Sequence, residues 1–227
     1  MNGDIIEIKI ANLSHIEGIF DLYQSVHINE KNLHRKIDQH HPDNFSQTGG
    51  IFKKLDFNTL KSMIFSQKYH VLVAESKLTK KVVGYISFHL ESIRRYKISE
   101  IQNCPDISSS GYQHFIGKLI KGKAAYAVDM IIANDWRRKN ICLFLQKFEY
   151  YILREQGYSY VFYEVYSVLE KGIEISNPNM LLAEKAFNSK IISYYYKNLQ
   201  VGSKIIQVRS DYHVVNIEKI DQGLAQP

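Results

Sequence analysis

The sequence predicts an α+β domain with a mixed, mostly antiparallel sheet flanked by helices. Segments rich in β-branched and aromatic residues, typical of strands, recur along the chain. Segments with apolar residues at helical spacing stand before, between and after them. Near the middle, one predicted helix joins two predicted strands directly, and these two strands are expected to run parallel. The element order is strand, helices, three strands, helix, strand, helix and two strands.

The strand predictions rest on local pattern. "IIEIKI" near the start alternates apolar and charged residues, which is the period of a half-buried strand. "YHVLVAE" and "KVVGYISFHLE" are separated by the polar "SKLTK" and indicate an antiparallel hairpin. The predicted strands span residues 5–10, 69–75, 81–91, 124–132, 158–168, 203–208 and 211–217.

The helix predictions rest on caps and period. Ser14 is placed to cap a first helix, with Glu17 at the third position of a capping box. Gly157 is placed to end a central helix, and Pro178 suits the first turn of a later one. The other predicted helices span about 57–67, 141–157 and 178–198. The central helix has an apolar face formed by Ile141, Leu145, Phe148 and Ile152.

Length and composition bound the class of protein. The chain has 227 residues, 45% of them hydrophobic, which is enough for one substantial core. We expect a single domain over residues 1–227, with polar insertions near 28–55 and 92–122. The 29 Lys and Arg exceed the 23 Asp and Glu by 29 − 23 = 6, a balance that suits an anionic partner but is equally met by solvated lysines.

The cellular setting is predicted from what the sequence lacks. No apolar run approaches the roughly 18 residues of a membrane helix, and the first residues are acidic where a secretion signal is basic. Cys104 and Cys142 are too few for a disulfide framework. We therefore expect a cytoplasmic protein without membrane contact, either a monomer or a homodimer.

The segment "VDMIIANDWRRKNICLFLQKF" carries the strongest chemical signal. A strand ends in a turn and a helix begins at once, so the unpaired N–H groups of the helix's first turn form an anion site. The cations of residues 137–139 add to this site. Asn140 tolerates a left-handed backbone, and Cys142 is small enough for a ligand to approach. An ordinary connection with a solvated basic turn is the alternative reading.

The element order and this segment resemble the GCN5-related N-acetyltransferase (GNAT) superfamily. Its signature is a strand ending in Val-x-Pro, followed by Arg or Gln-x-x-Gly-x-Gly or Ala at the start of a helix. In "IANDWRRKNIC", Ile132 stands at the Val, Asn134 at the Pro and Arg137 at the Arg. Asn140 and Cys142 stand at the two glycines, so both glycines are replaced.

The resemblance implies the GNAT fold and acetyl-CoA as acyl donor. In that fold the central parallel strands splay apart, and the pantetheine arm of acetyl-CoA inserts between them like an extra strand. Main-chain contacts with the arm and diphosphate binding by the helix start are implied. The implied acetyl-CoA-binding residues are Met130, Ile132, Arg137, Arg138, Lys139, Asn140, Ile141, Cys142 and Leu143.

The resemblance also implies direct attack of a primary amine on the thioester, with no metal. "SYYYKNLQVG" is similar to a family pattern in which a helix ends in Tyr-x-x-x-Gly-Phe, so Tyr196 is the implied general acid for the CoA thiolate. Tyr194 and Tyr195 are its adjacent alternatives. Asp129, inside an apolar strand, and Glu164 are candidate general bases, and each is alternatively a structural carboxylate.

Other functions stay open at this stage. The replaced glycines are compatible with a noncatalytic acyl-CoA-binding protein of the same fold. A basic nucleic-acid-binding module would explain the charge and the many tyrosines, but the cations are dispersed and no binding motif is found. The acceptor is expected to be a small-molecule or peptide amine, bound by residues 28–55 and 92–122.

Overall fold

The computed structural model describes residues 4–38, 40–42, 44–52, 55–90, 124–178 and 185–220. Within these ranges the strands form one eight-stranded sheet in the order β1-β2-β3-β4-β5-β8-β7, with β6 paired to β5. Neighbouring strands are antiparallel except β4 and β5, which are parallel. The predicted fold class, a mixed sheet with one parallel pair near its middle, is confirmed.

The strands are β1 (Ile6–Ile10), β2 (Tyr69–Ser76), β3 (Val82–His89), β4 (Ala124–Ile132), β5 (Tyr160–Glu170), β6 (Ile173–Ile175), β7 (Lys190–Val201) and β8 (Lys204–Asn216). The α-helices are α1 (Ile16–Val26), α2 (Leu33–Ile37), α3 (Phe45–Thr48), α4 (Phe57–Phe65) and α7 (Ile141–Glu155). Short 3-10 helices are η1 (Leu13–His15), η2 (Asn134–Trp136) and η3 (Ile217–Lys219).

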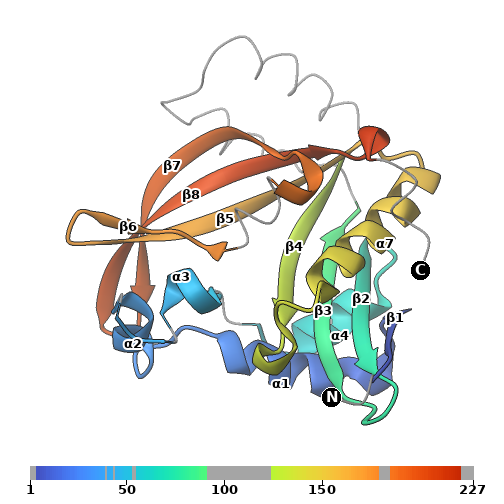
Figure 1. The fold of residues 1–227 in the computed structure, drawn as a ribbon, viewed down its shortest axis with the longest axis horizontal. Coiled ribbons are helices and arrows are strands. Elements are labelled where there is room, and N and C mark those ends of the chain that lie inside the picture. Colours follow the sequence, from blue (N-terminus) through green and yellow to red (C-terminus); the bar gives the residue numbers. More distant parts are fainter. Residues whose placement is uncertain are drawn as a thin grey trace.

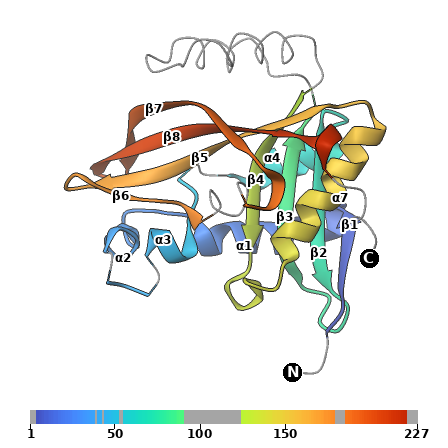
Figure 2. The ribbon, with the colours of Figure 1, turned by 45° about the horizontal axis from the view of Figure 1, so that its top comes forward.

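Helices cover both faces of the β1–β4 half of the sheet (Figure 1). α7 lies on one face, and α1 and α4 lie on the other. Figure 2 shows β5, β7 and β8 extending away from this half, with α2 and α3 beside their far ends. The sheet therefore has two parts, β1–β4 and β5–β8, which meet where β4 pairs with β5.

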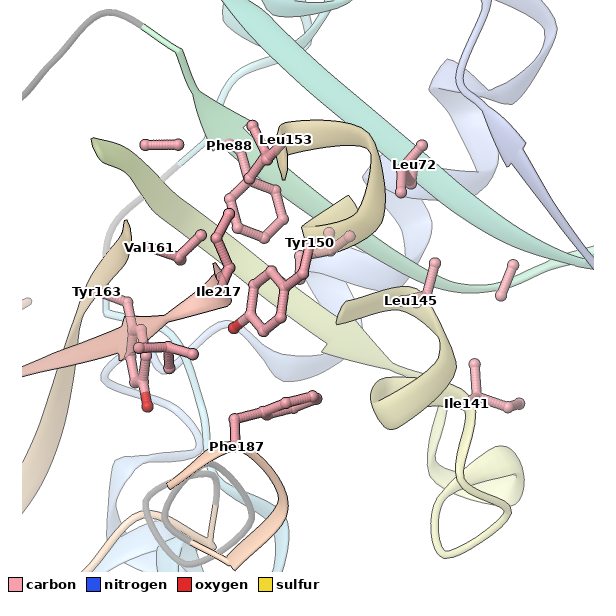
Figure 3. Packing of buried hydrophobic residues seen from close by; sticks show 14 of the residues in the cluster. Leu72, Phe88, Ile141, Leu145, Tyr150, Leu153, Val161, Tyr163, Phe187 and Ile217 are labelled. Carbon is pink, nitrogen blue, oxygen red and sulfur yellow. The ribbon is translucent and has the colours of Figure 1, made fainter. Parts of the chain in front are cut away.

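The core under α7 is built around Tyr150 (Figure 3). Its ring lies between Phe88, at 6.2 Å between centroids, and Phe187, at 5.0 Å, both in edge-to-face geometry. Leu145 and Leu153 are fully buried beside it. Burial of a side chain of this size contributes about 1.5–3 kcal/mol, so this cluster fixes α7 on the sheet.

Two details of the helix predictions are corrected. In α7 the side chain of Phe148 is 41% exposed, because the buried stripe runs instead through Leu145, Glu149 and Leu153. Ser14 does not cap the first helix: the N-cap of α1 is His15, without a side-chain cap, and Asn12 caps the 3-10 helix η1 that leads into α1. Asn12 has extended backbone, and its side chain accepts hydrogen bonds from the Ser14 amide and hydroxyl.

The predicted helix over 178–198 is wrong in its second half. Pro178 and residues 185–187 are helical, Asn188 follows with a left-handed φ of 50°, and β7 begins at Lys190. The run "IISYYY" carries β-branched and aromatic residues, and it pairs with β8 on both sides of an irregularity at Ile192. Long-range pairing therefore overrides the helical spacing.

The C-terminal strands also differ from their predicted bounds. Segments 203–208 and 211–217 form one continuous strand, β8, because Arg209 and Ser210 keep their partners in both β5 and β7. The unpredicted β6 folds back on β5 through Lys171 and Gly172, whose φ angles of 50° and 81° suit a tight hairpin turn.

Candidate active site

The two central parallel strands separate after a short paired segment. Their pairing runs from Ala124 with Tyr160 to Ala127 with Tyr163 and then stops. Residues 128–132 of β4 have no partner in β5, and Figure 1 shows the two strands diverging. On the edge of β5 opposite β8, pairing resumes only at Val168, where β5 pairs with β6. An extended ligand can therefore bind to the backbone of this part of β4.

A β-bulge lies in β4 at the point of separation. Ser87 of β3 pairs with Asp129, and Phe88 pairs with Ala127, so Val128 is skipped. A bulge leaves one residue outside the ladder and re-aims the neighbouring side chains. Backbone at Val128 is thus placed at the apex of the opening, and the Asp129 side chain is turned to the α1 face with Ser87.

A cavity of about 390 Å³ lies along the end of β4, beyond the point where β4 and β5 separate. One wall is the end of β4, the next is the turn and first helical turn of α7, and the opposite wall is formed by residues 46–51 at and after α3. The residues around it are Val26, Ser46, Gln47, Thr48, Gly49, Gly50, Ile51, Met130, Ile131, Ile132, Trp136, Arg137, Arg138, Asn140, Ile141, Cys142, Leu143 and Pro178. Eight of the nine expected acetyl-CoA-binding residues are among them, the exception being Lys139.

The first turn of α7 presents open backbone amides to this cavity. Asn140, at the N-cap, adopts the left-handed conformation (φ 61°, ψ 8°) that its sequence position suggested, and its side chain caps nothing. Within the described part of the chain, no protein group accepts a hydrogen bond from the amides of Ile141, Cys142 and Leu143. These amides stand at the positive end of a 15-residue helix, which favours an anion there.

The cations of the turn have different surroundings. Arg138, with a left-handed φ of 61°, is exposed, and the Lys139 ammonium lies 4.4 Å from the centre of the Trp136 ring. Arg137 donates from Nε to the Ile132 carbonyl at 3.2 Å and ties the turn to the end of β4. The two exposed cations are thus left to face an anionic ligand.

Cys142 is a neutral neighbour of the cavity and not a nucleophile. Burial raises the pKa of its thiol to about 12, so the thiolate is not formed at neutral pH. Its Sγ lies 3.0 Å from Met130 Sδ. The small side chain joins α7 to β4 where a larger one would fill the groove.

Residues 46–51 reach the cavity because glycine permits a close approach. Gly49 has a left-handed φ of 60°, and a Cβ on Gly50 would lie 2.7 Å from Cγ1 of Ile28. Ile51 forms a parallel bridge with His27 at the end of α1. Residues 46–51 belong to the insertion 28–55, whose expected role in binding the acceptor stays a prediction. The other expected stretch, 92–122, lies outside the described residues.

Glu164 is the centre of a hydrogen-bond network on the α1 face of β5. Its Oε1 accepts from the Tyr195 hydroxyl at 2.8 Å, from the Lys197 ammonium at 3.1 Å and from the Ser210 hydroxyl. The Glu164 side chain is only 4% exposed. Burial and then the charge of Glu164 raise the pKa of the adjacent Tyr166. The structural reading of Glu164 therefore has direct geometric support.

Lys197 completes this network and was not foreseen from sequence. Besides its ion pair with Glu164, its Nζ donates to the hydroxyls of Tyr166 at 2.9 Å and Tyr195 at 3.0 Å. The ammonium lies 4.3 Å from the centre of the Tyr166 ring. Residues two apart share one face of a strand, so the strand β7 brings Tyr195 and Lys197 to the same face. The helix predicted for this segment does not group them in this way.

Asp129 lies in a different environment, under α1. Burial and then the charge of Asp129 raise the pKa of both Tyr23 and Tyr85, and for Tyr23 an opposing effect of the Leu55 backbone is smaller. The neighbouring residue on the same face of β4, Ile131, lines the cavity. Asp129 therefore lies close to the inner end of the opening.

Tyr196 lies in a different element from the one that the resemblance implied. It lies on the strand β7, not on a helix, and its side chain is 52% exposed. It pairs with Arg209 and packs edge-to-face on Tyr194 at 5.9 Å. In the family pattern the tyrosine stands four residues before the glycine at the end of the helix. The left-handed residue after the helical turn here is Asn188, and the residue four positions before it, Glu184, lies outside the described residues. The role of Tyr196 as general acid stays a prediction without a supporting contact.

Two further properties concern the described residues alone. No helix among them is long and apolar enough to span a membrane. No three His, Cys, Asp or Glu side chains in these ranges are grouped so that they could hold a metal ion.

Comparison with solved structures identifies the fold. An N-acetyltransferase from Staphylococcus aureus Mu50 covers 94% of this chain and 99% of its own, with a TM-score of 0.58 and 11% identity. The ribosomal-protein-S18-alanine N-acetyltransferase of Escherichia coli covers 97% and 99%, with a TM-score of 0.56 and 8% identity. Arabidopsis thaliana NAA60 in complex with acetyl-CoA covers 94% and 99%, with a TM-score of 0.58 and 12% identity.

The chain therefore has the fold of the GCN5-related N-acetyltransferases, as the sequence resemblance predicted. Neither the models of protein families nor the curated proteins give a match to the sequence. Its structural neighbours are N-acetyltransferases, and the likeness covers nearly the whole of each chain.

Proposed function

We propose that the protein is an acetyl-CoA-dependent N-acetyltransferase that acetylates a primary amine by direct attack on the thioester. The observation that carries the proposal is the separation of β4 from β5 after Ala127 and Tyr163, with a cavity along the free end of β4 that reaches the unpaired amides at the start of α7. A ligand with an extended amide-bearing arm and a diphosphate matches both features.

Each part of acetyl-CoA has a complementary surface. The diphosphate binds the amides of residues 141–143, and the exposed cations Arg138 and Lys139 add charge to that site. The pantetheine arm lies along residues 128–132, whose backbone is not paired with β5. Recognition through main-chain groups makes few demands on side chains, which explains how Asn140 and Cys142 can stand where the family has glycine.

The reaction needs a proton acceptor and a donor for the oxyanion. An ammonium group cannot attack, so it first loses a proton to a base, and we assign this role to Asp129, which lies beside the bulge of β4. Backbone at the Val128 bulge is placed to stabilise the tetrahedral oxyanion. The C–S bond then breaks, the thiolate takes up a proton, and one proton is released overall.

The other two candidates have weaker support. Glu164 accepts hydrogen bonds from Lys197, Tyr195 and Ser210, so its oxygen is largely committed within the protein. Tyr196 on exposed β7 has no contact with the cavity wall that the described residues form. We expect the acceptor to be a small-molecule or peptide amine that approaches beside residues 46–51.

A noncatalytic acyl-CoA-binding protein is the second candidate. The ion pair between Glu164 and Lys197 favours it, because it occupies a carboxylate that would otherwise be a base. Such a protein binds CoA but does not consume the thioester.

Two measurements on the full chain separate the candidates. Protection from thermal unfolding by CoA tests the site, and thiol release from acetyl-CoA across an amine library tests the reaction. With turnover established, Asp129→Asn should lower kcat by about 10²–10⁴-fold, whereas Glu164→Gln and Tyr196→Phe should change it less than about tenfold. Absence of CoA protection would overturn both candidates, and protection without thiol release on any amine would favour the second.

A further inference from the structure

Three hydroxyl groups surround the position of Asp129 on the α1 face of the sheet. Ser87 is its direct cross-strand partner in β3, and Tyr85 pairs with the next residue on that face, Ile131. Side chains of directly paired residues lie about 4.5–5.5 Å apart at Cβ. Tyr23 comes from α1, which packs on β3 and β4, and belongs to the same apolar cluster as Tyr85.

These hydroxyls are buried and make no hydrogen bond of normal geometry within the described part of the chain. Tyr23, Tyr85 and Ser87 are each 0% exposed, and the Leu55 backbone acts on the Tyr23 phenol only enough to offset part of the rise of its pKa. A buried polar group without a partner is costly, and native proteins satisfy such groups with ordered water. Three of them around one carboxylate therefore indicate a small hydrated site inside the apolar cluster.

The hydrated site adjoins the cavity. Val26, one turn after Tyr23 on α1, and Ile131, two residues after Asp129 on β4, both line the cavity wall. Asp129 does not itself line the cavity, but it lies two residues from Ile131 on the same face of β4, so the hydrated site adjoins the cavity wall. The charge of Asp129 raises the pKa of both phenols, which agrees with an interaction across this short span.

We propose that Tyr23, Tyr85 and Ser87 are positioning residues that hold ordered water against Asp129 and thereby fix the carboxylate as the proton acceptor of the reaction. The inference rests on the proposed acetyltransferase function and deepens it. The hydroxyls donate through water to the carboxylate and keep it ionised and oriented toward the cavity. They do not touch the acceptor or acetyl-CoA.

The two conservative variants Tyr23→Phe and Ser87→Ala test the role. Each should lower kcat about tenfold while the KM for acetyl-CoA stays within about twofold of the unaltered protein. The melting temperature should hold or rise, because each change removes a buried hydroxyl that makes no hydrogen bond of normal geometry to the described residues. A purely structural role predicts an unchanged kcat and a lower melting temperature.

The matched control is Ser193→Ala. Ser193 on β7 is also buried, 4% exposed, and its hydroxyl has no hydrogen bond to the described residues. The kcat of Ser193→Ala should equal that of the unaltered protein. A loss equal to that of Ser87→Ala would show a general effect of buried serines and overturn the proposal.

A double-mutant cycle shows whether the hydroxyls act through Asp129. In an Asp129→Asn background, Tyr23→Phe should cause no further loss of kcat, because residues that act as a unit are not additive. A full additional tenfold loss would overturn the proposed link.

A crystal structure of the unaltered protein tests the water directly and needs no activity. Ordered water joining the Asp129 carboxylate to the hydroxyls of Tyr23 and Ser87 is expected, and a dry cluster would overturn the proposal. If the water is present but no amine supports thiol release, the acetyltransferase function fails and the hydrated site stands.

Discussion

The ammonium of Lys197 lies 3.1 Å from the carboxylate of Glu164 and bridges β7 to β5 across the intervening strand β8. Because the Glu164 side chain is only 4% exposed, removal of its cation leaves a charge with little access to water. The pair therefore helps to hold β5, β8 and β7 together.

Replacement of Lys197 should measure that contribution. We expect Lys197→Met to lower the free energy of unfolding by about 2–4 kcal/mol, because the carboxylate stays buried without its ion partner. Denaturant unfolding measures it. Lys77→Met is the matched control, since Lys77 pairs with Glu7 at 3.0 Å on the surface and should cost less than about 1 kcal/mol. Equal losses in the two variants would contradict a structural role of the buried pair.

The left-handed backbone of Asn140 should control both stability and CoA binding. Asn140→Val places a β-branched residue at a φ of 61°, and we expect a loss of about 1–2 kcal/mol together with weaker binding of CoA. Asn140→Gly adopts this conformation freely and should retain both properties. Calorimetric titration with CoA and thermal unfolding check the pair of variants. Tight binding by Asn140→Val would show that the helix start is not part of the site.

The cation at Arg138 should act on the diphosphate alone. Arg138→Gln should weaken CoA binding by about 3–10-fold and reduce its salt dependence, because one charge-assisted contact is lost. Binding of pantetheine, which has no diphosphate, should not change. Lys81→Gln is the control, since it removes an equal charge from the exposed turn before β3. An identical effect of both variants would indicate only a change of net charge.

His213 should make the stability depend on pH. Burial, and then the charge of Arg209, lower its pKa from 6.5 to about 4; its ring stacks on Tyr163 and its Nδ1 lies 3.4 Å from the Ser189 hydroxyl. Between these values the unfolded chain binds the extra proton and the folded chain does not. The contribution is therefore complete above pH 6.5 and is lost as pH falls toward 4, by about 3 kcal/mol.

The measurement is the free energy of unfolding at several pH values. His213→Gln should flatten the decline between pH 6.5 and 4 by this amount. A curve for His213→Gln that coincides with that of the unaltered protein would show that the imidazole titrates normally in the folded state.

Sequence reasoning succeeded where local pattern and final structure agree. The strand before Asn134, the turn and the helix from Ile141 are adjacent in sequence, so one segment contained both the strand edge and the helix start that define the cavity. The left-handed Asn140 was foreseen for the same reason, because the tolerance of asparagine for that conformation is a local property.

The failures have a common physical cause. The segment from Lys190 has apolar residues that fit a helical period, but its pairing with β8 runs from Lys190 to Val201 with one irregularity at Ile192 and overrides that spacing. The error carried Tyr196 to a helix and concealed the alternation that places Tyr195 and Lys197 beside Glu164. The direction in which a side chain points follows from the element type, so one wrong element changes a whole set of proposed roles.

The sequence by itself determined the order of the elements as far as β5, the parallel central pair and the cationic helix start, because short-range period and capping chemistry encode them. Only the tertiary structure decided that β4 leaves β5 after Ala127, that Glu164 is paired with Lys197, and that Asp129 lies among three buried hydroxyls. Those relationships join residues from strands and helices far apart in the chain, and no local pattern records which side chains meet across a folded sheet.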